Sequence, residues 1–222
     1  SHLRPTLILG LLDTLKLNQA RGTGATRLCE VGRVFVEHNG QNYECASVGF
    51  VIAESDAPAW LKREPVDFYT VKHYIGALAS AAGIDFARQP LGAVSGDYFG
   101  WQQGHSALAG GMSQGWTARF GLLNVAMVKD LGIEGRVYAG SFSILPEKLA
   151  SAKTRRRFSE FSLYPAALRD LALLVDAEIQ AEDVRKQLQK TARAVVGNVF
   201  ALESVSVFDV YRGKGVPEHQ KS

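Results

Sequence analysis

Leucine recurs every four residues near the start of the chain. Proline in a first helical turn loses no hydrogen bond, so Pro5 is a suitable first residue for a helix. Leu7, Leu11 and Leu15 then share one helical face, and the pattern ends at the glycines of residues 22–24. The sequence therefore predicts an amphipathic helix that begins at Pro5 and ends by about residue 22.

Two strand patterns follow this helix and are joined by a tight turn. Residues 27–37 alternate between polar and apolar positions, which predicts a half-buried strand. Its inward-facing residues are expected to be Leu28, Val34 and Val36. The pair Asn39-Gly40 favours a two-residue hairpin turn, because both residues tolerate a positive φ. Residues 43–52 are then predicted to form the returning strand.

The next pattern is that of a capped helix. Asp67 is a suitable N-cap, and Gly83 is a suitable C-terminal stop. The expected buried face consists of Phe68, Val71, Ile75, Leu78 and Ala82. Beyond it, the glycine-rich residues 92–121 predict antiparallel strands with tight turns. A short helix over residues 125–131 that ends at Gly132, and a strand over residues 136–144, complete this part.

A basic stretch separates this part from a different pattern. Residues 151–160 contain Lys153, Arg155, Arg156 and Arg157 and are predicted to form a linker. Residues 168–176 then predict a strand, residues 182–196 an amphipathic helix, and residues 199–211 a second strand. The apolar face of the helix is expected to comprise Val184, Leu188, Ala192 and Val195. A strand, a helix and a strand form half of a ferredoxin-like βαββαβ unit.

Composition places the chain among ordinary globular proteins. Of its 222 residues, 46% are hydrophobic and 21% are charged, and the formal net charge is +3. No apolar run reaches the length of a membrane span, and no signal peptide precedes the first pattern. The chain does not begin with Met, which indicates a fragment or a processed protein. Cys29 and Cys45 lack a metal-site spacing, so both are predicted to be reduced, buried thiols.

Several segments, in order along the chain, resemble the beta subunit of bacterial phenylalanyl-tRNA synthetase. In the first half these are Leu3-Arg4-Pro5-Thr6-Leu7, residues 28–35 (LCEVGRVF) and residues 66–72 (VDFYTVK). In the second half they are Tyr164-Pro165, residues 169–176 (RDLALLVD) and residues 207–213 (VFDVYRG). The resemblance implies an α+β fold: an antiparallel-sheet class II synthetase-like domain over residues 1–150, the linker 151–160, and a partial ferredoxin-like βαβ anticodon-binding domain over residues 161–222.

The first domain is expected to be catalytically inactive. Active class II domains carry an arginine directly after the Val-Phe strand position, where its guanidinium group holds the α-phosphate of ATP. Here Val36 follows Phe35, and a valine side chain offers no hydrogen-bond donor. The resemblance therefore implies a domain without catalytic residues or a cofactor of its own, which packs against the alpha subunit in a heterotetramer. ATP and Mg²⁺ would be used by that alpha subunit, in the cytoplasm.

The resemblance implies that the second domain contacts tRNA(Phe). Basic side chains hold nucleic-acid phosphates, while unpaired bases stack on aromatic rings. The candidate phosphate contacts are Arg169, Arg185, Lys186, Lys190, Arg193, Arg212 and Lys214. For each of them the alternative is an exposed solubilising charge. Phe208 and Tyr211 are candidates for stacking, although the pattern favours a core position for Phe208.

Two other classes of function can be compared with the sequence: a catalytic or metal-binding protein and a stand-alone binding module. The histidines lack ligand spacing such as HExxH, and no nucleophile motif accompanies them, which argues against a hydrolase or a metalloenzyme. A stand-alone RNA- or protein-binding module built on the same folds remains the alternative, because a fold alone does not fix a function.

Overall fold

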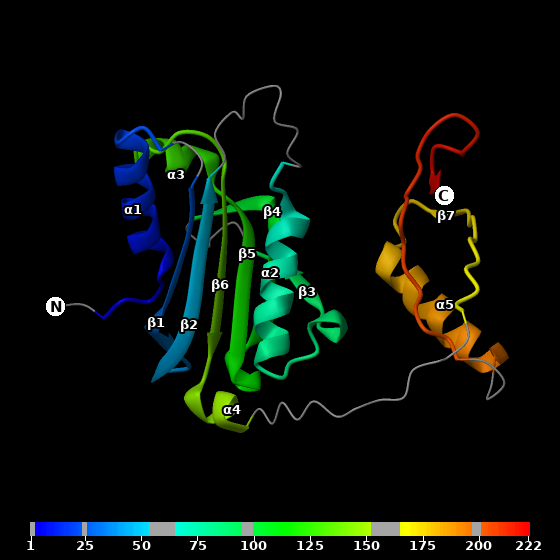
Figure 1. Ribbon diagram of the computed structural model, residues 1–222, viewed down its shortest axis with the longest axis horizontal. Coiled ribbons are helices and arrows are strands. Elements are labelled where there is room, and N and C mark those ends of the chain that lie inside the picture. Colours follow the sequence, from blue (N-terminus) through cyan, green and yellow to red (C-terminus); the bar gives the residue numbers. More distant parts are fainter. Residues whose placement is uncertain (1–2, 24–25, 54–64, 95–99, 152–164, 197–200) are drawn as a thin grey trace. The chain divides into compact units, whose positions relative to one another are not determined.

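The chain forms two units, residues 1–156 and 157–222, in the computed structural model (Figure 1). The structure describes residues 3–23, 26–53, 65–94, 100–151, 165–196 and 201–222. The predicted linker 151–160 lies outside these residues except for Ser151, so its bounds stay a prediction. The fold class is α+β, as predicted.

Unit 1 is built on a six-stranded antiparallel sheet with the strand order β1-β2-β6-β5-β4-β3. The strands are β1 (Thr26–His38), β2 (Gln41–Ala53), β3 (Leu91–Ala93), β4 (Trp101–Gly111), β5 (Trp116–Leu123) and β6 (Val137–Ile144). The helices are α1 (Ile8–Ala20), α2 (Phe68–Ala81), α3 (Val125–Asp130) and α4 (Pro146–Ser151), with short 3₁₀ turns at Phe86–Arg88 and Met112–Gln114. The predicted antiparallel strands and the four predicted elements before residue 83 are confirmed, but α1 begins at Ile8 and not at Pro5.

The β1–β2 hairpin closes as its sequence predicts. Asn39 and Gly40 both have positive φ, 53° and 74°, the backbone that a two-residue hairpin turn requires. Every residue from Thr26 to His38 pairs with one of β2 without interruption. Val34 is buried, while Leu28 and Val36 are half-buried against neighbouring clusters, which confirms the predicted inward face.

Helices α1 and α2 lie on opposite faces of this sheet. Leu7 of α1's first turn packs over Gly49, where a Cβ atom would come within 2.8 Å of the Leu7 Cβ. The next residue, Phe50, meets Tyr74 of α2 edge to face at 5.7 Å between ring centroids. Successive side chains of a strand point to opposite faces, so Gly49 belongs to the α1 face and Phe50 to the α2 face.

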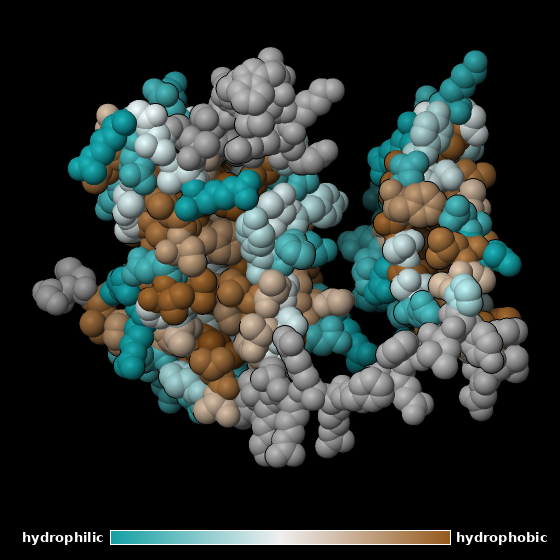
Figure 2. Space-filling view, in the orientation of Figure 1, coloured by the Kyte–Doolittle hydropathy of each residue, from teal (hydrophilic) through white to brown (hydrophobic). Residues whose placement is uncertain are grey.

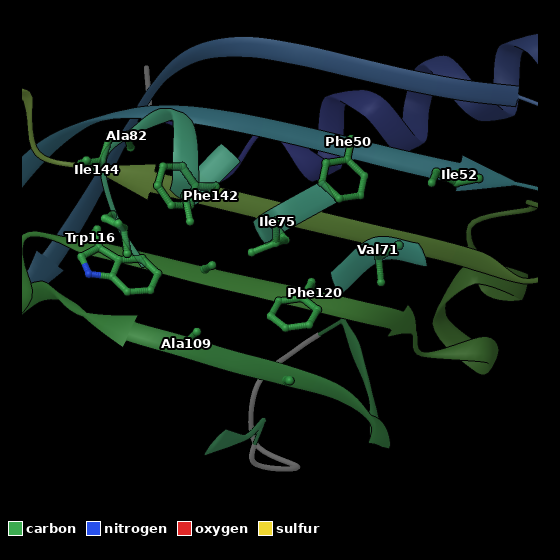
Figure 3. Close-up of a cluster of buried hydrophobic side chains, with 14 of the residues drawn as sticks. Phe50, Ile52, Val71, Ile75, Ala82, Ala109, Trp116, Phe120, Phe142 and Ile144 are labelled. Atoms are coloured by element: carbon green, nitrogen blue, oxygen red, sulfur yellow. The ribbon is translucent and has the colours of Figure 1, made fainter. Parts of the chain in front are cut away.

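The largest core lies between α2 and the sheet. Val71 and Ile75 of α2 are fully buried there and lie over Phe120 of β5 (Figure 3). Phe120 also stacks on Phe68, with 5.4 Å between the ring centroids. Gly140 of β6 pairs with Phe50 on one side and with Phe120 on the other, and a side chain at Gly140 would overlap the Phe50 ring. A glycine between two aromatic residues therefore provides the room in which their rings pack.

The predicted cap of α2 is confirmed and is reciprocal. The backbone N–H of Thr70 donates to Oδ1 of Asp67 at 2.8 Å, and the backbone N–H of Asp67 donates to Oγ1 of Thr70 at 3.4 Å. Gly83 follows the helix with φ of 75°, and Gly132 follows α3 with φ of 74°. Both predicted stops are therefore confirmed.

Unit 2 differs most from its prediction. Its elements are β7 (Val175–Asp176), α5 (Ala181–Val196) and β8 (Gln220–Lys221). The helix is confirmed, and Val184, Leu188 and Ala192 are half-buried, but Val195 is 80% exposed and Val196 is half-buried in its place. The predicted strand 168–176 is reduced to two residues, and the described part of the predicted strand 199–211 is not a strand.

The reason is that the described residues of unit 2 provide no full neighbouring strand for these segments. Val175 and Asp176 pair with Lys221 and Gln220, and Ser222 exchanges both backbone hydrogen bonds with Tyr211, at 2.7 and 3.0 Å. The last three residues therefore form backbone hydrogen bonds with two segments: Gln220 and Lys221 with residues 175–176, and Ser222 with Tyr211. Apart from these contacts, no described residue forms a ladder with residues 168–174 or 201–210, and an extended segment becomes a strand only through such a ladder.

Candidate nucleic-acid interface

All seven predicted phosphate contacts lie in unit 2. Arg185, Lys186, Lys190 and Arg193 are on α5, Arg169 is on the extended segment before β7, and Arg212 and Lys214 flank the turn that leads to β8. The structure thus brings four of them onto one helix and two into one turn. All are exposed except Arg185, which is half-buried.

Three of the cations on α5 form one exposed stripe. Lys186, Lys190 and Arg193 follow one another at helical spacings of four and three residues, which places them on the same side of the helix. A helix rises 1.5 Å per residue, so the stripe is about 10 Å long. This cationic stripe, defined as Lys186, Lys190 and Arg193, lies on the side of α5 away from half-buried Leu188.

Arg185 is held differently from the residues of the cationic stripe. Its Nε and Nη2 atoms donate to the two carboxylate oxygens of Glu182 at 2.8 and 2.7 Å, and its Nη1 atom donates to Oε1 of Gln189 at 3.4 Å. The hydrogen bond to Glu182 raises the pKa of Arg185. The ammonium group of Lys186 is farther from Glu182, at 3.9 Å. The guanidinium group of Arg185 is therefore engaged within the helix itself.

The remaining candidates have local contacts. Nη1 of Arg169 donates to the backbone oxygen of Leu168 at 2.7 Å, and the Tyr211 hydroxyl donates to the backbone oxygen of Lys214 at 3.3 Å. Within the described part of the chain, the side chains of Arg212 and Lys214 form no hydrogen bond. Their turn therefore presents two further cations to solvent.

The expected core position of Phe208 is wrong. Its side chain is 77% exposed, and Tyr211 in the same segment is 48% exposed. The segment 201–210 has no neighbouring strand among the described residues that would form a covered face under the ring. Both aromatic rings are thus accessible to a stacking base.

In unit 1, Val36 is the residue on which the predicted lack of catalysis rests. Its half-buried side chain packs against the cluster of Leu7, Val34 and Cys45. Within the described ranges, no group of three His, Cys, Asp or Glu residues is placed to hold a metal ion. None of the described helices is both long and apolar enough to cross a membrane.

The two cysteines differ in a way that the sequence pattern did not reveal. Cys45 is 1% exposed, whereas Cys29 is exposed, so the prediction of two buried thiols is wrong for Cys29. Cys29 pairs with Phe50 and shares its face of the sheet. Helix α2 packs over β5 and β6 and does not extend to β1 at the sheet edge, which is why Cys29 is exposed.

Two family models match the chain in succession. The phenylalanyl tRNA synthetase beta chain CLM domain matches residues 1–144, and the ferredoxin-fold anticodon binding domain matches residues 162–222. The chain belongs to the phenylalanyl-tRNA synthetase beta chain family. The resemblance seen in the sequence is thereby confirmed.

Curated relatives agree with this family. The phenylalanine–tRNA ligase beta subunit of Cereibacter sphaeroides is 30% identical over 96% of this chain, and that of Synechocystis sp. is 32% identical over the whole of this chain. The beta subunit of Mannheimia succiniciproducens is 31% identical, also over the whole chain. The matches cover 26% and 27% of these relatives, so the chain spans about a quarter of their length.

Proposed function

We propose that this chain is a non-catalytic part of a phenylalanine–tRNA ligase, in which unit 1 packs against an alpha subunit and unit 2 contributes to the binding of tRNA(Phe). The observation that carries the RNA-binding role is the cationic stripe, because it lies inside the segment that matches the anticodon-binding model. Three exposed cations on one side of a helix form the clustered charge that phosphate binding requires.

The proposed lack of catalysis rests on Val36. Its side chain packs into an apolar cluster and has no donor with which to bind a phosphate. ATP and Mg²⁺ would then belong to the alpha subunit, and this chain would bind neither. Isothermal titration of the chain with Mg·ATP is expected to show no saturable heat, and a saturable signal would overturn this part of the proposal.

The structure divides the predicted phosphate contacts into two groups. Lys186, Lys190 and Arg193 are exposed, whereas Arg185 is held by Glu182. We therefore assign phosphate contacts to the cationic stripe, with Arg169, Arg212 and Lys214 as further exposed candidates. Arg185 is assigned a structural role in α5.

Binding of a tRNA(Phe) anticodon stem-loop, followed by fluorescence anisotropy at several salt concentrations, tests this assignment. Each phosphate contact contributes about 0.7 to the slope of log K against log salt for single strands. Replacing Lys186, Lys190 and Arg193 together by Gln is expected to lower that slope by about 2. The matched control, Arg185→Gln, is expected to leave the slope unchanged, and equal slopes for all proteins would contradict the assignment.

Co-expression with an alpha subunit tests the packing role. Co-elution of the two chains in size-exclusion chromatography is expected. Failure of the chains to co-elute would favour a stand-alone RNA- or protein-binding module built on the same folds.

A further inference from the structure

Strand β1 lies at one edge of the sheet in unit 1, and a long, regular edge strand can pair with a strand of another molecule. All 13 of its residues pair with β2 in an unbroken register, so its outer edge is regular as well. Successive backbone groups of a strand point to alternate sides, and β2 therefore engages only half of them. On the side of unit 1 that contains α1 and β1, at the left of Figure 2, hydrophobic and hydrophilic residues lie side by side.

Arg4 occupies the middle of this outer edge, in the segment that runs beside β1 into α1 (Figure 1). The backbone N–H of Phe35 donates to the carbonyl oxygen of Arg4 at 3.0 Å. Nε of Arg4 donates to the carbonyl oxygen of Arg33, also at 3.0 Å. A residue of a parallel neighbouring strand would bond to the same two groups through its own N–H and carbonyl. The guanidinium group thus takes the place of a backbone donor, and Arg4 binds the edge as a strand residue would.

Three features hold Arg4 in this position. Nη1 of Arg4 forms an ion pair with Oε1 of Glu30 at 2.6 Å, which adds to the bond with the main chain. Pro5 restricts the residue before it to extended conformations and has no N–H with which to continue a ladder. Gly32 leaves room for the guanidinium group, because a Cβ there would overlap Nη2 of Arg4. We call Arg4 and Pro5 the edge strap.

The outer edge of β1 is complementary to a second copy of itself. Two antiparallel copies that overlap over all 13 residues place the first residue of one opposite the last of the other, with Gly32 on the two-fold axis. In this register Arg27 of each copy lies opposite Glu37 of the other, and both side chains are exposed. Opposite charges directly across an antiparallel pair stabilise it. Full overlap of the two strands therefore also pairs their charges.

We propose that the edge strap keeps two copies of this chain from joining through an antiparallel β1–β1 pair. The central hydrogen bonds of such a pair need the outward groups of Arg33 and Phe35, and the strap engages both. The strap also places a proline and a charged side chain at the edge, two devices that oppose strand addition. Without the strap, the sheets of two copies join into one across the two-fold axis.

Arg4→Ala opens the edge, and sedimentation velocity of the whole chain over a range of concentrations measures the result. The variant is expected to form a dimer at concentrations at which the wild type is a monomer. Gly32→Ala reaches the same end by another route, because its Cβ displaces the guanidinium group while every donor of Arg4 remains. Since both changes act on one contact, the double variant is expected to dimerise no more strongly than Arg4→Ala alone.

Arg88→Ala is the matched control, because it removes another exposed arginine and its ion pair, with Asp85 at 3.0 Å, from outside β1. This variant is expected to remain a monomer. A charge reversal tests the register of the dimer. Glu37→Arg, added to Arg4→Ala, places like charges opposite one another and is expected to weaken the dimer about tenfold. Further addition of Arg27→Glu is expected to restore the dimer.

The outcomes separate the edge strap from other causes of association. If Arg4→Ala and the wild type sediment alike, the proposal is overturned. Circular dichroism and urea unfolding show whether each variant is folded, and if Arg4→Ala is not, a folded Gly32→Ala decides by the same criterion. Oligomers that do not respond to the charge at position 37 form through another surface, and this result also overturns the β1–β1 pair.

Discussion

Cys45 shows how one buried side chain makes stability depend on pH. It packs with Leu7 and Val34 on the α1 face of the sheet. Burial, with a smaller contribution from the Glu147 carboxylate, raises the pKa of its thiol above the ordinary value of 9.0. Above that pH the unfolded chain loses the thiol proton while the folded chain keeps it, so the unfolded state is favoured.

The free energy of unfolding is therefore expected to fall as the pH rises above about 9, by at most about 1.4 kcal/mol per pH unit from this group. The stabilisation is fully present below that pH. Urea unfolding between pH 7 and 10 measures it. Cys45→Ala is expected to be less stable at pH 7 but to lack this part of the pH dependence, and parallel pH profiles of the two proteins would contradict the assignment.

A second single residue that matters is Asp67. Its carboxylate accepts hydrogen bonds from both the backbone N–H and the hydroxyl of Thr70. Asp67→Ala removes the cap of α2 and is expected to lower the free energy of unfolding by about 1 kcal/mol. Asp67→Asn keeps an acceptor oxygen and is expected to lose much less, as measured by urea unfolding followed by circular dichroism.

At the scale of the elements, Gly140 in the sheet and Gly10 in helix α1 differ in the space available for a side chain. A Cβ at Gly140 of β6 would overlap the Phe50 ring, whereas a Cβ at Gly10 of α1 would meet nothing within 4 Å. Gly140→Ala is therefore expected to destabilise unit 1 by about 1–3 kcal/mol through overpacking.

Gly10→Ala is the matched substitution and is expected to stabilise the chain by about 0.5–1 kcal/mol, because glycine inside a helix loses more backbone entropy on folding than alanine does. Thermal unfolding of the two variants against the wild type compares them. A loss of stability in both variants would show that the space around Gly10 is not free in solution.

How far the elements follow from the sequence depends on how local their determinants are. The Asn39-Gly40 turn and the Asp67 cap are set by residues within a few positions of one another, and both are confirmed. The strand predicted over residues 168–176 is wrong except at Val175 and Asp176, because a strand depends on partners far away in the sequence. The prediction that Cys29 is buried was wrong for the same reason. Its burial depends on which strands of the sheet α2 covers, and α2 is distant from Cys29 in the sequence.

At the scale of the whole molecule, only part of the candidate site could be predicted from the sequence. The sequence pattern predicted all four basic residues of α5 as phosphate contacts and did not distinguish between them. Only the structure shows that Glu182 engages Arg185 and leaves Lys190 and Arg193 exposed. The sequence does contain a signal for this difference. Glu182 and Arg185 are opposite charges three residues apart on one helix, a spacing that predicts an ion pair.

The two units also differ in how much apolar surface they bury. Unit 1 holds three clusters of buried hydrophobic residues, whereas no hydrophobic residue among the described positions 165–222 is buried. Local stability follows the density of buried apolar contacts. The free energies for opening hydrogen bonds are therefore expected to differ strongly between the units.

Amide hydrogen exchange followed by mass spectrometry measures this difference. Amides of β2 and β6, which are paired on both sides in the centre of the sheet, are expected to exchange only with global unfolding of unit 1. Amides of α5 are expected to exchange orders of magnitude faster, through local opening. Because a ligand stabilises the form that it binds, adding the tRNA(Phe) anticodon stem-loop is expected to slow exchange in α5 and not in β6. Equal protection of α5 and β6 in the free chain would contradict the expected difference in stability.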